Sequence, residues 1–211
     1  MRFVLPPQGT LEPNNEHDPL PYYYHPLLGW LYRKRLQMGL DLVPAGGATV
    51  LEIGVGSGIL IPTLTARFPL YTGVDLVLAD GLAPLVAPGC QARFIRADLL
   101  AESDLPEARF DVVICLSVLE HIADSERAAA ALARTLVKGG TLVAGYPMVN
   151  GLMAGLFRTI GFHNIEAHHV ASPTAIDHAL RRVLRPIARR AFPLFAPVSL
   201  ALYQCTSWAK E

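Results

Sequence analysis

The chain has few cysteines and no long hydrophobic run. Its three cysteines, Cys90, Cys115 and Cys205, are far apart, and none belongs to a C-x-x-C pair. An odd number of distant cysteines argues against a disulfide framework and predicts a reducing, cytoplasmic location. The longest apolar run, residues 191–203, is interrupted by two prolines and is shorter than the roughly 20 residues that cross a bilayer.

An excess of charge is also absent, and the N-terminus lacks the apolar core of a signal peptide. The 18 basic and 18 acidic residues cancel, so the general attraction of a strongly basic domain to nucleic acid is missing and no such partner is expected. Hydrophobic residues make up 52% and charged residues 17%, which argues against disorder over the whole chain. The length of 211 residues fits one domain with a full core, residues 26–211, after an irregular or mobile N-terminal arm, residues 1–25.

Short apolar segments bounded by turn residues alternate with helical segments through the middle of the chain. The expected strands are TVLEI (49–53), LYTGV (70–74), ARFIR (92–96), DVVICL (111–116) and TLVAGY (141–146). Helices are expected over 26–43 and 125–137. This alternation predicts an α/β protein with a doubly wound, mostly parallel sheet. Such sheets bind ligands beyond the carboxyl ends of their strands.

The C-terminal part departs from this alternation. Residues 161–170 and the final segment 198–210 are expected to form strands. Between them, Ser172–Pro173 is a typical helix start, and Pro186 is expected to kink the helix that follows. One side of this helix is rich in arginine: Arg181, Arg182, Arg185, Arg189 and Arg190. Three interpretations stay open for 176–190, namely a solvated helix packed on the domain, a dimer contact, or a peripheral membrane contact.

The segment VLEIGVGSG, residues 50–58, places three glycines at alternate positions after the first expected strand. A strand, a tight glycine turn and a helix start allow the backbone to approach a ligand closely. The dinucleotide fingerprint G-x-G-x-x-G requires glycine where this chain has Ile59, which weakens the hypothesis of a nucleotide-linked oxidoreductase. A P-loop is excluded because no Gly-Lys-Ser/Thr follows. The spacing is instead G-x-G-x-G, with Glu52 two residues upstream.

This pattern resembles the class I S-adenosylmethionine-dependent methyltransferases, in their small-molecule, "LEHI"-containing form. The resemblance continues in order through GVDL (73–76), RADLL (96–100), FDVVICLSVLEHI (110–122) and LVKGGTLVAGYP (136–147). It implies a Rossmann-like, seven-stranded sheet with an N-terminal helix and an extra C-terminal helix. Residues 49–147 would form the cofactor-binding core, and residues 148–211 the acceptor-side and C-terminal segment.

The resemblance also implies which residues bind S-adenosylmethionine. An acid at Glu52 would hold the methionine end, Asp75 would accept both ribose hydroxyls, and Asp98 would accept from the adenine amino group. The complete set is Glu52, Gly54, Gly56, Gly58, Asp75, Leu76, Asp98, Leu99, Leu116 and Ser117. Simpler interpretations stay open: a tight turn for the glycines, strand-end caps for the aspartates, and ordinary core packing for the leucines.

Methyl transfer needs a general base only when the acceptor must lose a proton. His121 is the candidate base, although it could instead begin the next helix. No metal site is expected, because adjacent His168 and His169 on a strand would point to opposite faces. Tyrosines 22–24 are candidates for a lid over the cofactor. The predicted function is methylation of a small-molecule or lipid-like acceptor, and the alternative is a non-catalytic binding subunit that keeps the fold.

Overall fold

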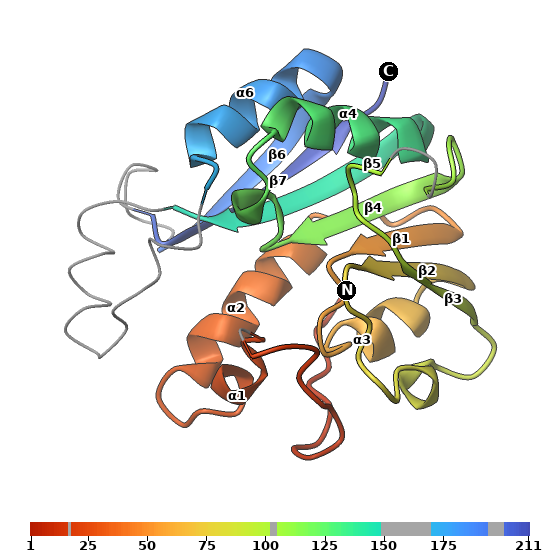
Figure 1. Ribbon diagram of the computed structural model, residues 1–211, viewed down its shortest axis with the longest axis vertical. Helices are drawn as coiled ribbons and strands as arrows, with labels where there is room; N and C mark the ends of the chain where they lie inside the picture. Colours follow the sequence, from red (N-terminus) through yellow and green to blue (C-terminus); the bar gives the residue numbers. More distant parts are fainter. Residues whose placement is uncertain (17, 102–104, 149–169, 194–200) are drawn as a thin grey trace.

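The computed structural model describes residues 1–16, 18–101, 105–148, 170–193 and 201–211 (Figure 1). Seven strands form one sheet in the order β3-β2-β1-β4-β5-β7-β6. The five strands β1 to β5 run parallel, and β7 is antiparallel to both β5 and β6. The strands are β1 (Thr49–Ile53), β2 (Leu70–Asp75), β3 (Gln91–Arg96), β4 (Phe110–Leu116), β5 (Leu136–Pro147), β6 (Arg185–Phe192) and β7 (Tyr203–Ala209). The predicted doubly wound, mostly parallel sheet is confirmed.

Helices cover both faces of this sheet. Figure 1 shows α4 and α6 on one face, and α1, α2 and α3 on the other. The helices are α1 (Leu20–Tyr23), α2 (Gly29–Leu40), α3 (Ile61–Thr65), α4 (Ser125–Thr135) and α6 (Pro173–Val183), with 3₁₀ turns η1 (Ala83–Leu85) and η2 (Leu119–His121). The helices expected over 26–43 and 125–137 are therefore present as α2 and α4, each shorter than predicted.

The central strands are buried on both sides, which explains their continuous apolar sequence. Because successive side chains of a strand alternate between faces, Leu51 packs under α4 and α6 while Val50 packs under α2 and α3. Trp208 is fully buried in the first core, and Tyr71 is buried in the second. With both faces used for the core, the strand ends are left for polar side chains.

The predicted single helix through 176–190 is wrong in its second half. Helix α6 ends at Val183, and residues from Arg185 onward form the edge strand β6. Pro186 explains the change, because proline lacks an N–H donor and its ring disfavours helical geometry at the preceding residue. At the edge of a sheet a missing donor is tolerated, since one side of the strand needs none. The predicted start is confirmed, because Ser172 caps the helix through its hydroxyl.

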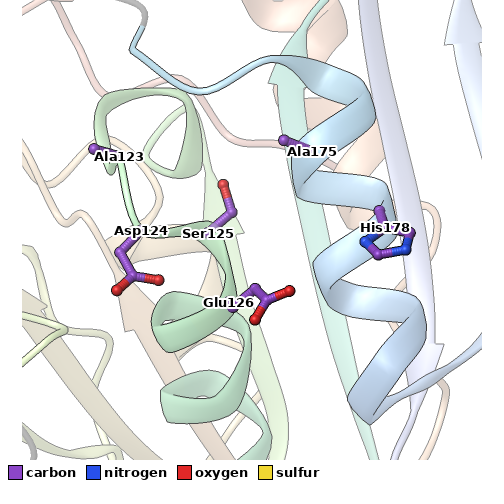
Figure 2. Close-up of a pocket in the computed structure, with 6 residues that line it drawn as sticks. All are labelled: Ala123, Asp124, Ser125, Glu126, Ala175 and His178. Carbon is purple, nitrogen blue, oxygen red and sulfur yellow. The ribbon is translucent and has the colours of Figure 1, made fainter.

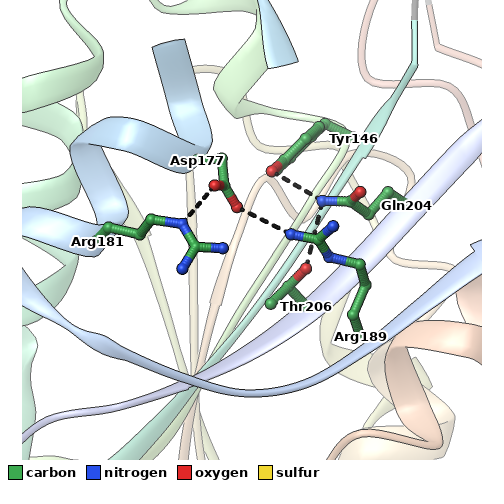
Figure 3. Close-up of polar contacts among 6 residues, drawn as sticks. All are labelled: Tyr146, Asp177, Arg181, Arg189, Gln204 and Thr206. Atoms are coloured by element: carbon green, nitrogen blue, oxygen red, sulfur yellow. Dashed lines mark hydrogen bonds and ion pairs between the residues drawn. The ribbon is translucent and has the colours of Figure 1, made fainter. Parts of the chain in front are cut away.

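The arginines of this region do not form one basic face. Figure 3 shows Asp177 between two of them, with Arg181 Nε 2.6 Å and Arg189 Nη2 3.5 Å from its carboxylate oxygens. The other three also pair with acids: Arg182 with Glu126, Arg185 with Glu211, and Arg190 with Asp41. Beside this network, Gln204 Nε2 donates to Tyr146 and Thr206. The peripheral membrane contact through 176–190 stays a prediction, without the continuous amphipathic helix that suggested it.

The N-terminal arm is irregular apart from α1, and it lies against the domain. Leu11 and Leu20 are buried with the side chains under α2 and α3. The arm is also fastened through its backbone, because Phe3 N donates to Gln37 Oε1 at 2.8 Å. The strand expected over 161–170 falls, except for its last residue, outside the described residues, as do His168 and His169. In the described part of the chain, no helix is both long and apolar enough to cross a bilayer.

Asp111 ties the start of β1 to β4, and this contact gives a stability prediction. One of its carboxylate oxygens accepts from Ala48 N at 2.8 Å, and from Thr49 N and Oγ1 at 3.0 and 2.8 Å. Asp111→Ala should lower the free energy of unfolding by about 1–2 kcal/mol, measured by urea denaturation at neutral pH. Asp80→Ala, at an exposed position, is the control and should change little.

The same contact predicts a pH dependence. The hydrogen bonds from the Ala48 and Thr49 backbone lower the pKa of Asp111 below its ordinary value. A lowered pKa stabilises the fold above the ordinary pKa, and this stabilisation is lost as the pH falls through the lowered value. The difference between the parent and Asp111→Ala should therefore shrink in acid, and an unchanged difference would contradict the role of the carboxylate.

Candidate cofactor site

The glycine turn follows β1, and its three glycines have different surroundings. All three have positive φ, at +81° for Gly54, +55° for Gly56 and +83° for Gly58. A Cβ atom on Gly54 would collide with the side chain of Val118, which follows β4. At Gly56 the nearest atom to such a Cβ would be a carboxylate oxygen of Asp18, at an ordinary 3.6 Å. Gly58 is closely approached by apolar side chains. Of the three, only Gly56 could therefore hold a Cβ atom without a steric collision, and the Asp18 carboxylate lies in contact with that position.

Glu52 lies on β1 beneath this turn and is 3% exposed. The hydroxyl of Tyr71 donates to its Oε2 at 2.6 Å. Burial raises the pKa of Glu52 to about 8; the Tyr71 hydrogen bond opposes the shift, and the charge of Asp75 adds to it. Close to neutral pH the side chain is therefore largely protonated, and a cation placed beside it would favour its carboxylate form.

Asp75 ends β2 and reaches the glycine turn. Its Oδ2 accepts from Gly56 N at 2.8 Å, and its Oδ1 accepts from Val77 N at 3.1 Å. Leu76 follows with 62% of its side chain exposed. A carboxylate and an exposed apolar side chain thus stand together at the carboxyl end of β2, next to the turn.

The other predicted residues after β3 and β4 differ in exposure. Asp98 is exposed, and its Oδ1 accepts from Leu100 N at 2.9 Å. Leu99 is buried in the core under α4 and α6, and Leu116 is half-buried and packs against Met38 and its neighbours. Besides any contact with a cofactor, Asp98 therefore caps the turn that follows it, and Leu99 and Leu116 pack in the hydrophobic core.

Ser117, directly after β4, has a φ of +59°, which is rare for a residue with a side chain. Its N–H donates to Gly145 O at 2.7 Å, and its hydroxyl lies 2.9 Å from that of Tyr203. Residues held in such conformations by their surroundings are often found at functional sites. The turn aims the Ser117 side chain toward β7.

The two polar residues of "LEHI" lie on opposite sides of η2. His121 is exposed, whereas Glu120 is 3% exposed. Burial raises the pKa of Glu120 to about 7, and the positive charge of Arg35 opposes that shift. Its Oε2 has no hydrogen-bond partner among the residues that the structure describes. The interior acid is thus Glu120, and the predicted role of His121 has no support from its exposed position.

Arg35 is a cation of this region that the sequence did not single out. Its guanidinium carbon lies 4.3 Å from the ring centre of Tyr32, and the rings of Tyr23 and Tyr203 lie at 5.7 and 5.8 Å. One terminal nitrogen donates to the Tyr23 hydroxyl, while the buried Nε has no partner within the described part of the chain. The run Arg33-Lys34-Arg35 is uniform in sequence, and only the orientation of α2 turns one of the three inward.

The N-terminal arm reaches the glycine turn through Asp18. Its carboxylate accepts from Asn14 N and Leu20 N, and from the backbone and hydroxyl of Ser57. Burial raises the pKa of Asp18, and these hydrogen bonds oppose the shift. The arm therefore carries a third carboxylate to the turn, besides Glu52 and Asp75.

A separate cleft of about 530 Å³ lies between the first turns of α4 and α6 (Figure 2). Its lining residues are Ala123, Asp124, Ser125, Glu126, Ala175 and His178. Its acids already have partners, because Asp124 caps α4 and Glu126 pairs with Arg182. Among the described residues, no group of three or more His, Cys, Asp or Glu side chains is placed to hold a metal. The strand-end residues, rather than this cleft, form the candidate site.

A family model described as a methyltransferase domain matches residues 30–185. An uncharacterized methyltransferase of Mycobacterium tuberculosis is 33% identical over 119 residues, covering 55% of this chain and 59% of that protein. A ubiquinone biosynthesis O-methyltransferase of Paracidovorax citrulli is 32% identical over 139 residues, covering 63% and 52%. The chain thus spans between half and three fifths of the length of these curated relatives.

Solved structures show the same fold. The N-methyltransferase NodS from Bradyrhizobium japonicum, in complex with S-adenosylhomocysteine, aligns with a TM-score of 0.62 at 18% identity over 93% of this chain and 94% of its own. A 1,6-didemethyltoxoflavin-N1-methyltransferase from Burkholderia thailandensis aligns with a TM-score of 0.61 at 19% identity, over 83% and 76%. Because the family model covers most of the chain and the sheet has the same architecture, this protein belongs to the class I S-adenosylmethionine-dependent methyltransferase family.

Proposed function

We propose that this protein transfers a methyl group from S-adenosylmethionine to a small or lipid-like acceptor. The observation that carries the proposal is the Asp75 carboxylate, which lies hydrogen-bonded to Gly56 at the end of β2. A carboxylate in this place can accept from two adjacent hydroxyls, as a ribose presents them. The alternative is a non-catalytic binding subunit that keeps the fold; it predicts a damaged cofactor site, whereas the acids and glycines of this site are present.

The cofactor would lie across the carboxyl ends of β1, β2 and β4. The ammonium group of its methionine end would face Glu52, whose carboxylate form it favours. The ribose would face Asp75, and exposed Leu76 would cover the adenine. Asp98 would accept from the adenine amino group, as the family resemblance implies. Gly56 supports the same placement, because its N–H donates to Asp75 and its φ of +55° favours glycine.

Arg35 would hold the carboxylate of the methionine end. That carboxylate needs a cation, and the residues predicted from sequence supply none. Arg35 supplies a buried guanidinium with an unpartnered Nε in the described structure, next to Tyr203. Tyr203 in turn contacts Ser117, one of the residues that the family resemblance implies for cofactor binding. A charge-assisted hydrogen bond to a buried donor is one of the stronger interactions available.

The chemical step breaks the bond between sulfur and the methyl carbon and forms a bond from that carbon to the acceptor. The protein contributes by holding both partners in line, because the displacement disperses charge rather than creating it. When the acceptor carries a proton, Glu120 is the better placed of the two LEHI residues to receive it. Its pKa of about 7 suits proton transfer near neutral pH, and its Oε2 is unsatisfied among the described residues.

The acceptor class rests on the relatives. Several of the curated relatives are ubiquinone biosynthesis O-methyltransferases, and one solved structure contains 1,6-didemethyltoxoflavin. These names favour a small or lipid-like acceptor over a protein or a nucleic acid. The net charge of zero agrees with this choice, because it gives no general attraction to nucleic acid.

Calorimetric titration with S-adenosylhomocysteine tests the proposal, together with label transfer from S-adenosyl-[methyl-³H]methionine into cell extract. The parent should bind and transfer label. Asp75→Asn should weaken binding by about 10- to 100-fold, because it removes one charged acceptor for two hydroxyls. Asp80→Asn, at an exposed position after the end of β2, is the control and should bind like the parent. The absence of binding by the parent would refute the proposal and favour the non-catalytic subunit, whereas binding without label transfer would contradict methyl transfer to an acceptor in that extract.

The role of Arg35 is testable with two ligands. Arg35→Gln should weaken S-adenosylhomocysteine binding by about 10-fold or more, because the ligand carboxylate loses its cationic partner. The same variant should bind 5′-methylthioadenosine as tightly as the parent, because that ligand has no amino-acid end. Asp75→Asn should weaken both ligands alike. An equal loss of both ligands in Arg35→Gln would show that the arginine only supports the fold.

The raised pKa of Glu52 predicts proton release on binding. At about pH 7 the buried carboxyl is mostly protonated, so a bound ammonium should displace about one proton. Calorimetry in two buffers of different ionisation enthalpy measures this number. Glu52→Gln should bind without releasing that proton. Equal proton release in the parent and the variant would contradict the contact between Glu52 and the ammonium.

A further inference from the structure

Residues 19–40, which form α1, α2 and their connection, have an unusual composition. This stretch contains three basic residues and no acidic residue. It also holds five of the 17 aromatic side chains of the chain: Tyr22, Tyr23, Tyr24, Trp30 and Tyr32. The chain as a whole carries no net charge, whereas this stretch is basic and rich in aromatic residues.

Part of this stretch is exposed and apolar. The side chains of Leu27 and Trp30 are 75% and 53% exposed, which is high for residues of their size. Lys34 follows Trp30 by one helical turn, so an ammonium group lies on the same side of α2. In the described residues, neither Arg33 nor Lys34 has an acidic partner within ion-pairing distance. The arginines of α6 and β6 differ in this respect, because each is paired with an acid.

The exposed patch is connected to the candidate site through aromatic rings. Trp30 contacts Phe192 at the end of β6, with ring centres 5.6 Å apart in an edge-to-face arrangement. Phe192 is the register partner of Tyr203 on β7. Tyr203 contacts Ser117, at the carboxyl end of β4. A series of aromatic side chains therefore runs from Trp30 at the surface to Tyr203, which contacts Ser117 of the candidate cofactor site.

We propose that this patch, formed by Leu27, Trp30, Lys34 and Phe192 and called here the Trp30 surface, binds the interface of a bilayer that contains anionic lipid. Tryptophan favours the boundary between apolar chains and polar headgroups, because its ring is apolar and its N–H needs a polar partner. The Lys34 ammonium beside it is attracted to anionic headgroups, and acids that would oppose it are absent from the stretch. A lipid-like acceptor would then reach the site along the rings of Phe192 and Tyr203; this last clause rests on the proposed function.

Tryptophan fluorescence of the full chain tests this contact. The chain has two tryptophans, and Trp208 is fully buried, so a change in emission on adding vesicles reports on Trp30. Vesicles of phosphatidylcholine with phosphatidylglycerol should shift the emission to shorter wavelength and sediment the protein. Vesicles of phosphatidylcholine alone should do so less, because the electrostatic attraction is absent.

Matched variants identify the surface. Trp30→Ser should reduce sedimentation with the mixed vesicles by about tenfold, and Lys34→Gln by about fivefold. Leu70→Ser is the control. Leu70 is also an exposed apolar residue, but it lies at the start of β2, at the end of the sheet opposite the candidate site, so its substitution should have no effect. Equal sedimentation of Trp30→Ser and the parent would overturn the proposal. If the parent self-associates without vesicles while Trp30→Ser does not, that result would show that the surface binds a second copy of the chain, and it would overturn the membrane proposal.

The same preparations are titrated with S-adenosylhomocysteine, so that the two proposals fail separately. Cofactor binding without any vesicle binding overturns only the membrane contact. Vesicle binding without cofactor binding overturns only the methyltransferase proposal. Unchanged cofactor affinity of Trp30→Ser and Lys34→Gln also shows that these variants remain folded.

Discussion

The hydrogen bond from Gly56 N to the Asp75 carboxylate joins the ends of β1 and β2, and the candidate site is built around it. It exists because parallel strands end at one edge, where both faces of the sheet are already used for the core. Charged side chains are costly to bury between the sheet and its helices, so they gather at this edge. The glycine turn allows the carboxylate to approach the backbone, and Val118 fills the space beside Gly54.

Buried ionisable side chains gather at this edge of the described structure. Glu52 and Glu120 have raised pKa values because they are buried, and Arg35 is enclosed by three tyrosines. Burying such groups costs free energy unless opposite charges or hydrogen bonds compensate. An amino-acid group carries both charges, so the methionine end of the proposed cofactor can compensate for Glu52 and Arg35 together. The Trp30 surface extends the same region outward with apolar and basic groups.

Most of the fold followed from local pattern. The strands at 49–53 and 111–116 were recognisable because apolar residues dominate both, as in strands buried on both faces. The helix start at Ser172–Pro173 was readable because capping is a property of a few adjacent residues. The helix end was not: spacing of apolar residues favoured a helix through 190, while Pro186 and pairing with β7 produced a strand. Pairing with a distant segment leaves no mark in local periodicity.

The sequence by itself determined the family, the glycine turn and the positions of Glu52 and Asp75, because these depend on short spacings and on residue types that chemistry restricts. Which of several adjacent polar residues faces the interior was decided by the tertiary structure alone. It placed Glu120 inside and His121 outside, chose Arg35 from three adjacent basic residues, and brought Tyr203 to Ser117 across 86 positions of sequence. The physical reason is orientation: a side chain's environment depends on the angle of its element against distant elements, and only the packed core sets that angle.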